Sequence, residues 1–287
     1  MQNCSLDQWY GSAKTFTWYE HLIIYKECLS DNETLLLIHG FPTASYDWWK
    51  IWEPLSNKFS LLAPDMLGFG YSAKPSGFPY SIMKQADLIL DLLKEKGINK
   101  FHILAHDYGD TVAQEILARA TKDNRLNIKS VCLLNGGIFP EAHHPLMIQK
   151  LLMSPIGFVL SRLLNRQKFE KSFSRIFGAQ TQLSKEELAI YWNLVSRENG
   201  HHIAHKIIRY MQERVVNRKR WVGALKDYPG KRGLINGPED PISGRVMVRR
   251  YQEIISKENI WLLEGIGHYP QVEAPGELLE RYIEFLQ

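Results

Sequence analysis

The sequence predicts an α/β fold, with a mostly parallel central sheet, helices on both faces of that sheet and an inserted helical cap. Short apolar runs alternate with amphipathic stretches along most of the chain, and this alternation favours a parallel sheet. It stops for about 80 residues that contain helical patterns alone. Polar residues follow several of the predicted strands directly, where open α/β sheets place their sites.

Six apolar runs predict buried parallel strands. Each run is short and ends near Gly, Pro, Asp or Asn, as buried strands commonly do. The runs cover residues 35–39, 59–65, 101–107, 130–135, 233–237 and 260–264. Two runs nearer the N-terminus, residues 15–19 and 22–25, predict an antiparallel hairpin at the sheet edge.

Amphipathic segments predict the helices. Those that would cover the sheet lie at residues 81–96, 111–120, 245–256 and 277–286. Between about residues 140 and 228 the helical patterns lie at 147–152, 156–164, 185–196 and 201–216. We therefore divide the chain into a first core segment (1–139), a helical cap (140–228) and a second core segment (229–287). The alternative for residues 140–228 is a long loop without structure, and such loops are uncommon in compact domains.

Length and charge limit the classes of function. A chain of 287 residues, 45% of them apolar, can bury roughly three quarters of its unfolded surface. A net charge of +4 is too small to indicate a dedicated nucleic-acid binder. We expect the partner to be a small-molecule substrate, with no nucleic acid and no membrane, and the pattern leaves the oligomeric state open.

The cysteines and the N-terminus indicate the compartment. The three cysteines are widely spaced and odd in number, which is typical of a reducing environment. No basic and apolar leader is visible at the N-terminus, and no apolar stretch approaches the roughly 18 residues of a membrane span. We expect a cytoplasmic protein.

Asp107 lies in the predicted sharp turn between a strand and a helix. Small residues stand two positions to either side of it, Ala105 and Gly109. This spacing is that of a nucleophile elbow, a strained turn in which larger side chains would collide. An Asp that opens a helix could instead be a simple cap that favours the helix dipole.

Further residues in the right order favour the catalytic interpretation. Asp240 follows a late strand and His268 follows the last one, so a nucleophile, an acid and a base occur in that order at strand ends. As the acid of this set we choose Asp240 rather than its neighbour Glu239, because of its position after the predicted strand. The backbone N–H groups of Phe41 and Tyr108 would form the oxyanion hole.

These motifs resemble the α/β-hydrolase fold family, in particular the branch with an aspartate nucleophile that includes haloalkane dehalogenases and epoxide hydrolases. The motifs that carry the resemblance are His39-Gly40-Phe41-Pro42, the segment 65–72, His106-Asp107-Tyr108-Gly109, and Gly267-His268 with 273–275. A closer resemblance, to the mesoderm-specific transcript group, rests on the segments 43–48, 107–110, 135–141 and 220–225.

The resemblance implies a cofactor-free and metal-free hydrolase. Asp107 would displace a leaving group to form an alkyl ester, and His268, oriented by Asp240, would activate the water that cleaves it. The family places this acid three residues beyond the glycine, as Asp240 stands beyond Gly237. The alternative is a ligand-binding or scaffold protein that keeps the fold without turnover.

The sequence departs from both groups of relatives. Phe41 stands where many dehalogenases have a halide-holding Asn, and Tyr108 stands where they have Trp. Epoxide hydrolases use two cap tyrosines, and Trp221 and Val222 occupy the place of the later one. These departures leave the chemistry open between epoxides, alkyl halides and esters.

The candidate substrate contacts are His39, Trp48, Tyr191, Tyr210 and Trp221. For each tyrosine, packing with the hydroxyl in water is the commoner arrangement. His201 and His205 are interpreted as surface histidines, because no third metal ligand accompanies them at a recognisable spacing.

The cap predicts a neutral, hydrophobic substrate. We expect the apolar side chains of the cap to cover the nucleophile. No cationic clamp is evident at the positions that match the active sites of the relatives, and Arg209, Arg214 and Arg218 are therefore discounted as an anion site. The apolar set is Met147, Leu151, Phe158, Leu163, Phe169, Phe173 and Ile176.

Overall fold

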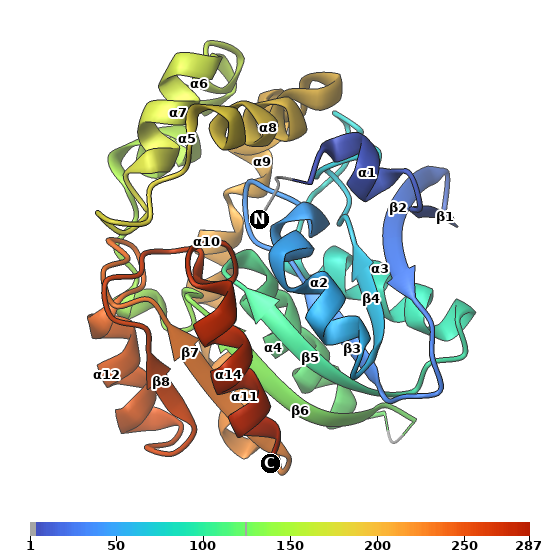
Figure 1. The fold of residues 1–287 in the computed structure, drawn as a ribbon. Coiled ribbons are helices and arrows are strands. Elements are labelled where there is room, and N and C mark those ends of the chain that lie inside the picture. The colour runs from blue at the N-terminus through green and yellow to red at the C-terminus, as the bar shows by residue number, and fades with distance from the viewer. Residues whose placement is uncertain (1–3, 124) are drawn as a thin grey trace.

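The computed structural model describes residues 4–123 and 125–287 as an eight-stranded sheet covered by helices on both faces, with a helical layer across one end (Figure 1). The order across the sheet is β1-β2-β4-β3-β5-β6-β7-β8. The strands are β1 (Lys14–Trp18), β2 (His21–Cys28), β3 (Thr34–Ile38), β4 (Ser60–Pro64), β5 (Lys100–His106), β6 (Asn127–Leu134), β7 (Lys231–Asn236) and β8 (Ile260–Leu262).

The predicted strands and edge hairpin are confirmed. β1 and β2 pair antiparallel, β2 pairs antiparallel with β4, and the strands from β4 to β8 pair parallel. All of β4 and all but the first residue of β5 are buried. Both faces of the central strands are therefore covered, which explains why they are continuous apolar runs rather than alternating ones.

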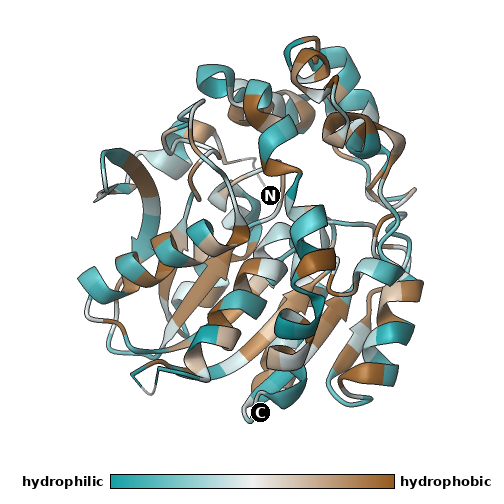
Figure 2. Cartoon of the chain, turned by 180° about the vertical axis from the view of Figure 1, so that it is seen from behind, coloured by the Kyte–Doolittle hydropathy of each residue, from teal (hydrophilic) through white to brown (hydrophobic). Residues whose placement is uncertain are grey.

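The helices that flank the sheet place their apolar faces against it, and Figure 2 shows brown strands beneath helices that carry brown and teal sides. The side chain of Ser81 caps the helix α3 (Ile82–Glu95) by accepting from the backbone N–H of Lys84. The helices of the core segments are α1 (Leu6–Tyr10), η1 (Ser45–Trp48), α2 (Trp49–Ser56), α3 (Ile82–Glu95), α4 (Tyr108–Ala120), α12 (Arg245–Ile254), α13 (Pro270–Glu273) and α14 (Pro275–Leu286).

Between β6 and β7 the chain forms helices and loops, as the sequence predicts for this insertion. Its helices are η2 (Pro140–Ala142), α5 (Met147–Met153), α6 (Gly157–Arg162), α7 (Arg166–Ser174), α8 (Lys185–Ser196), η3 (Arg197–Ile203), α9 (Ala204–Ile207), α10 (Tyr210–Val216) and α11 (Arg218–Asp227). α5 to α9 form the layer over the carboxyl ends of the parallel strands, whereas α11 returns to the core and packs on α4 (Figure 1).

The prediction of one helix over 201–216 is wrong. The chain breaks there into η3, α9 and α10, and Glu198 and Asn199 adopt positive φ angles of 50° and 58° just before the breaks. The buried side chains of this stretch, Ile203 and Tyr210 among them, still recur at helical spacing, so the apolar pattern did not reveal the breaks. α7 and α11 are additional helices that the apolar pattern did not predict.

Candidate active site

The turn between β5 and α4 holds Asp107 in a strained conformation. Its φ and ψ are 46° and −102°, outside the regions that non-glycine residues prefer. A Cβ at position 109 would lie 2.2 Å from the carbonyl oxygen of Ile38. Gly109 therefore lets α4 start against β3, and the turn lifts the Asp107 side chain above the sheet.

The structure brings Asp107, Asp240 and His268 together at the carboxyl ends of β5, β7 and β8. Nδ1 of His268 lies 2.7 Å from Oδ2 of Asp240, and Nε2 lies 4.0 Å from Oδ2 of Asp107. All three side chains are nearly fully buried. Glu239, the neighbouring acid, is exposed.

Two residues that the sequence analysis did not assign hold Asp240. The Asn135 side-chain amide and the Ser243 hydroxyl both donate to Oδ2, at 3.0 and 2.7 Å, and the Ile242 N–H donates to Oδ1. Burial raises the pKa of Asp240, but the His268 charge and these hydrogen bonds outweigh it, so the pKa is lowered overall. The signal that could have found Asn135 is its place at the end of a buried strand.

Opposing influences act on the pKa of His268. Burial lowers it, but the negative charge and hydrogen bond of Asp240, followed by the charge of Asp107, raise it to about 9. His106 supports the same loop, because its Nε2 lies 2.7 Å from the His268 carbonyl oxygen. Burial lowers the pKa of His106 to about 3, so this ring stays neutral and donates through Nε2.

One oxygen of the Asp107 carboxylate is already bound by the backbone. The Phe41 N–H donates to Oδ2 at 3.1 Å, and its role in an oxyanion hole stays a prediction. The structure gives no hydrogen bond from the Tyr108 N–H to this carboxylate, and the role of Tyr108 as a second donor stays a prediction.

Arg214 and Tyr210 lie at the other oxygen. The Tyr210 hydroxyl is 3.5 Å from Oδ1, and Nη2 of Arg214 is 3.7 Å from Oδ1 and donates to the Asp107 carbonyl at 3.1 Å. Arg214 is 2% exposed and also donates from Nε to Thr111. Arg214, which the sequence analysis discounted as part of an anion site, therefore lies beside the carboxylate of Asp107. Arg214 could not be identified from the sequence, because it lies on a cap helix far from the motifs that carry the family resemblance.

Two glycines after β6 make room for these charged groups. A Cβ at Gly136 would lie 2.0 Å from Oδ2 of Asp110, and one at Gly137 would lie 2.0 Å from Nη1 of Arg214. Asp110 is fully buried, and burial, followed by the charge of Asp107, raises its pKa well above the ordinary value. The Asp107 carboxylate, in contrast, accepts a hydrogen bond from the Phe41 N–H.

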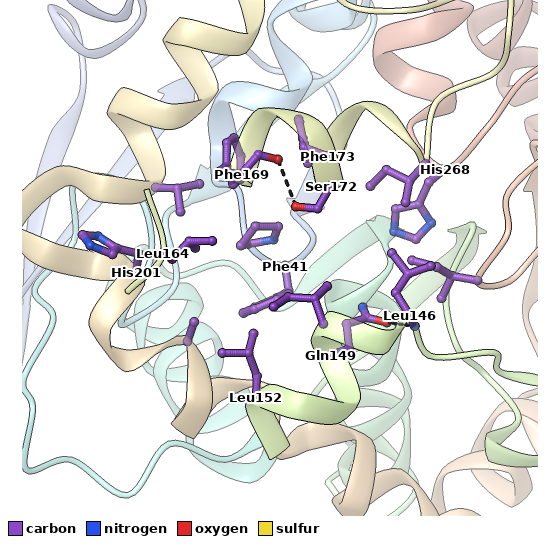
Figure 3. Close-up of a pocket in the computed structure, with 16 residues that line it drawn as sticks. Phe41, Leu146, Gln149, Leu152, Leu164, Phe169, Ser172, Phe173, His201 and His268 are labelled. Atoms are coloured by element: carbon purple, nitrogen blue, oxygen red, sulfur yellow. Dashed lines mark hydrogen bonds between the residues drawn. The ribbon is translucent and has the colours of Figure 1, made fainter. Parts of the chain in front are cut away.

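An apolar cavity extends from His268 and Phe41 up into the cap (Figure 3). Phe41 lies in the middle of the view, with Leu152 and Leu146 on one side and Phe169 and Phe173 on the other. The lining residues are Phe41, Pro42, Leu146, Ile148, Gln149, Leu152, Leu164, Phe169, Ser172, Phe173, Ile176, Val195, His201, Ala204, Ile242 and His268. None of them is Lys, Arg, Asp or Glu.

None of the five predicted substrate contacts lines this cavity. His39 is fully buried and accepts from the Met66 N–H, while Nδ1 donates to the Gly40 carbonyl. Trp48 and Tyr191 are buried in an aromatic core cluster, and Trp221 donates to Glu115 on α4. Tyr210 alone among the five has its polar atom beside Asp107.

The predicted apolar set of the cap divides into two groups. Phe169, Phe173 and Ile176 line the cavity. The other four are exposed, because α5 and α6 turn them outward; they are Met147, Leu151, Phe158 and Leu163. The interpretation of His201 as a surface residue is also wrong, since it is partly buried and lines the cavity.

Within residues 4–123 and 125–287, no three His, Cys, Asp or Glu side chains are grouped so that they could hold a metal ion. No helix of this part of the chain is long and apolar enough to cross a membrane.

Comparisons with known proteins agree with this architecture. Residues 33–275 match the family model of the alpha/beta hydrolase fold. The chain is similar to the mesoderm-specific transcript protein of Mus musculus, with 39% identity over 98% of this chain and 88% of the other. It is also similar to LipZ of Mycobacterium tuberculosis, a hydrolase by name, with 33% identity over 100% and 99% of the two chains. Among solved structures, haloalkane dehalogenase DbeA from Bradyrhizobium elkani superimposes with a TM-score of 0.79, at 21% identity over 95% of this chain and 96% of that one.

Proposed function

We propose that this chain, which belongs to the alpha/beta hydrolase fold family and is a hydrolase of that family, uses Asp107 as its nucleophile. The observation that carries the proposal is the set of distances that joins Asp107, His268 and Asp240 at the strand ends. The substrate is a small, neutral and hydrophobic epoxide, alkyl halide or ester. The cavity supports this substrate class, because its walls carry no Lys, Arg, Asp or Glu.

The two oxygens of Asp107 have different roles in this mechanism. Because the Phe41 N–H binds Oδ2, Oδ1 is the oxygen that attacks. Oδ1 forms a bond to a saturated carbon of an epoxide or halide, and the leaving oxygen or halide takes the electron pair of the broken bond. The Tyr210 hydroxyl lies beside Oδ1 and can donate to an oxygen leaving group there. With an ester substrate, Oδ1 attacks the acyl carbon instead, the bond to the alcohol oxygen breaks and the alkoxide leaves with its electron pair, so that the uncharged intermediate on Asp107 is a mixed anhydride.

Formation of the intermediate prepares His268 for the second step. With a pKa of about 9, its ring is protonated at neutral pH in the free enzyme. The ester on Asp107 carries no charge, so one of the causes that raise this pKa disappears and the ring loses its proton more readily. The neutral Nε2 then takes a proton from a water that attacks the Asp107 carboxyl carbon, and Oδ1 leaves with the product.

The Phe41 N–H stabilises both steps. It binds Oδ2 first as a carboxylate oxygen and then as the oxyanion that forms when water adds. Asp240 keeps the imidazole oriented and balances its charge during the proton transfer. Arg214 fixes the backbone of the nucleophile through the Asp107 carbonyl, which makes it a positioning residue.

The test is to trap the intermediate in the His268→Gln variant. The variant is incubated with styrene oxide, bromohexane or p-nitrophenyl butyrate, and the peptide that contains Asp107 is weighed by mass spectrometry. The proposal predicts an adduct on Asp107 with a compound that the wild type turns over. In heavy-oxygen water, a single wild-type turnover places the label in Asp107 and leaves the first product unlabelled. Turnover without an adduct and without label in Asp107 contradicts the covalent mechanism.

A binding protein without turnover remains the second candidate, and Phe41 at the place of a halide-holding Asn favours it. It predicts that wild type and His268→Gln are equally inert toward the whole panel while a ligand still raises the melting temperature.

A further inference from the structure

The outer helices of the cap expose an unusual number of apolar side chains. Among the described residues, thirteen large apolar side chains are exposed, and six of them lie within residues 147–163. Phe158 is 51% exposed and Leu163 is 57% exposed. The others are Met147, Leu151, Ile156 and Val159. Figure 2 shows brown segments on these helices at the outer edge of the molecule. A concentration of this kind marks an interaction surface.

The same segment holds the positive charge of the chain. Residues 146–175 contain six basic residues and one acidic residue, whereas the whole chain carries +4. The rest of the chain is therefore close to neutral. All six basic side chains are exposed, and only Arg166 forms an ion pair with a carboxylate of the described residues, that of Glu170. The other five are Lys150, Arg162, Lys168, Lys171 and Arg175.

A groove joins the apolar and the basic groups. Its lining is mainly apolar and includes three cations, Lys168, Lys171 and Arg175. The remaining lining residues are Ile148, Leu160, Leu163, Leu164 and Ser172. Ile148, Leu164 and Ser172 also line the active-site cavity, so the groove and the cavity are neighbours on the two sides of the same side chains.

We propose that this surface, the cap patch, docks on an anionic lipid bilayer; the patch consists of the six exposed apolar residues and five unpaired cations just named. The apolar side chains enter the boundary between head groups and acyl chains, and the cations lie against lipid phosphates. This departs from the expectation of no membrane partner. The docking requires no spanning helix, and it does not depend on the catalytic mechanism proposed above.

The charge distribution selects this partner over a second copy of the chain. A symmetric dimer through the cap patch would place two strongly basic surfaces against each other, which costs repulsion. An anionic bilayer satisfies the cations and the apolar side chains at the same time. Docking also turns the shared wall of groove and cavity toward the bilayer, from which a hydrophobic molecule can enter.

The test is co-sedimentation of the full chain with vesicles. Vesicles of phosphatidylcholine mixed with phosphatidylglycerol are compared with vesicles of phosphatidylcholine alone, at low and at high sodium chloride. We expect binding to the mixed vesicles that salt weakens. The variant with Lys168→Glu, Lys171→Glu and Arg175→Glu should bind the mixed vesicles more than about tenfold less, given the attraction of each cation near such a surface. Phe158→Ser with Leu163→Ser should weaken binding at every salt concentration.

Matched controls separate the patch from net charge. Lys58, Lys94 and Lys122 are exposed and precede β4, β5 and β6, at the end of the sheet opposite the cap. Their triple replacement by Glu changes the net charge equally and should leave binding nearly intact, as should Leu29→Ser. Circular dichroism of every variant verifies folding.

Three results would overturn the proposal. The first is a wild type that does not sediment with the mixed vesicles. The second is a control triple variant that loses as much binding as the patch variant. The third is a dimer in light scattering that the patch substitutions dissociate, which would make a second copy the partner.

Discussion

The active site and the cap patch both contain several charged side chains, but these charges are buried and paired in the active site and, among the described residues, exposed without an ion pair on the cap patch. At the strand ends, the charges of Asp107, Asp240, His268 and Arg214 are buried within hydrogen-bond or ion-pair distance of one another. On the cap patch, five cations are exposed without a carboxylate of the described residues beside them. A buried charge must be compensated inside the protein, because desolvation is costly. The compensated charges can therefore remain buried, whereas the concentration of exposed cations next to exposed apolar side chains is what points to a partner outside the molecule.

The largest expected effect tests whether Asp107 differs from its neighbour Asp110. Asp107→Asn should lower kcat by more than about a thousandfold, since an amide cannot act as the nucleophile. Asp110→Asn is the matched control on the same helix: burial raises the pKa of Asp110, so its neutral form already resembles an amide. Steady-state kinetics on the best substrate of the panel measure both. Equal losses would show that the carboxylate of Asp110 also takes part.

The next effect tests the pairing of Asp240 with His268. Asp240→Asn should lower kcat by roughly a thousandfold or more and let the ester on Asp107 accumulate, because the imidazole loses its orientation and its countercharge. The exposed Glu239→Gln is the control and should keep full activity. Mass spectrometry of the Asp107 peptide distinguishes a blocked second step from a blocked first one. Activity retained in Asp240→Asn and lost in Glu239→Gln would move the role to Glu239.

The same pair predicts a pH dependence of stability. Because the pKa of His268 is raised from 6.5 to about 9 in the folded protein, its protonation stabilises the fold fully below pH 6.5. This contribution is lost as the pH rises toward 9. Urea unfolding across this range should show the decline in wild type and a smaller one in Asp240→Asn. Identical slopes would mean that Asp240 does not hold the proton on His268.

The sequence predicted the two regions to different extents, because different features of the fold determine where their residues lie. Asp107, Asp240 and His268 could be found because parallel strands bring their carboxyl ends to one edge, so position after a strand determines place in space. Arg214 could not be found in this way, and Tyr210 was predicted only as one of several candidate contacts. They approach Asp107 from α10, and the breaks that aim this helix depend on packing within the cap.

The cap patch escaped prediction for a related reason. Phe158, Leu163, Phe169 and Phe173 have similar side chains and similar helical spacing in the sequence, yet two are exposed and two line the cavity. Which face of a short helix is buried depends on the neighbours it packs against, and α7 was not visible in the apolar pattern. A charge count over residues 146–175 was the available signal.

Removal of the buried Arg214 sharpens the contrast between compensated and exposed charge. Arg214→Met should cost about 3 kcal/mol of unfolding free energy, because Asp107 loses one of its two neighbouring cations and Thr111 loses its buried donor. The exposed Arg209→Met on the same part of the cap should stay within about 0.5 kcal/mol of wild type. Urea denaturation measures both. A near-neutral Arg214→Met would show that His268 alone compensates the charge of Asp107.

The last prediction compares two phenylalanines within the cap, Phe173 and Phe158. For Phe158 the expected change in the free energy of unfolding is close to zero. Phe173 is 4% exposed and packs against Tyr191, Phe177 and Tyr269, so Phe173→Ala should cost about 3 kcal/mol or more through the cavity it creates. Phe158 is half exposed, and Phe158→Ala should change the free energy of unfolding by less than about 0.5 kcal/mol. If Phe158→Ala destabilised the free protein as strongly as Phe173→Ala, the side chain would serve the fold. A negligible cost, together with weaker vesicle binding, would instead assign it to a partner outside the chain.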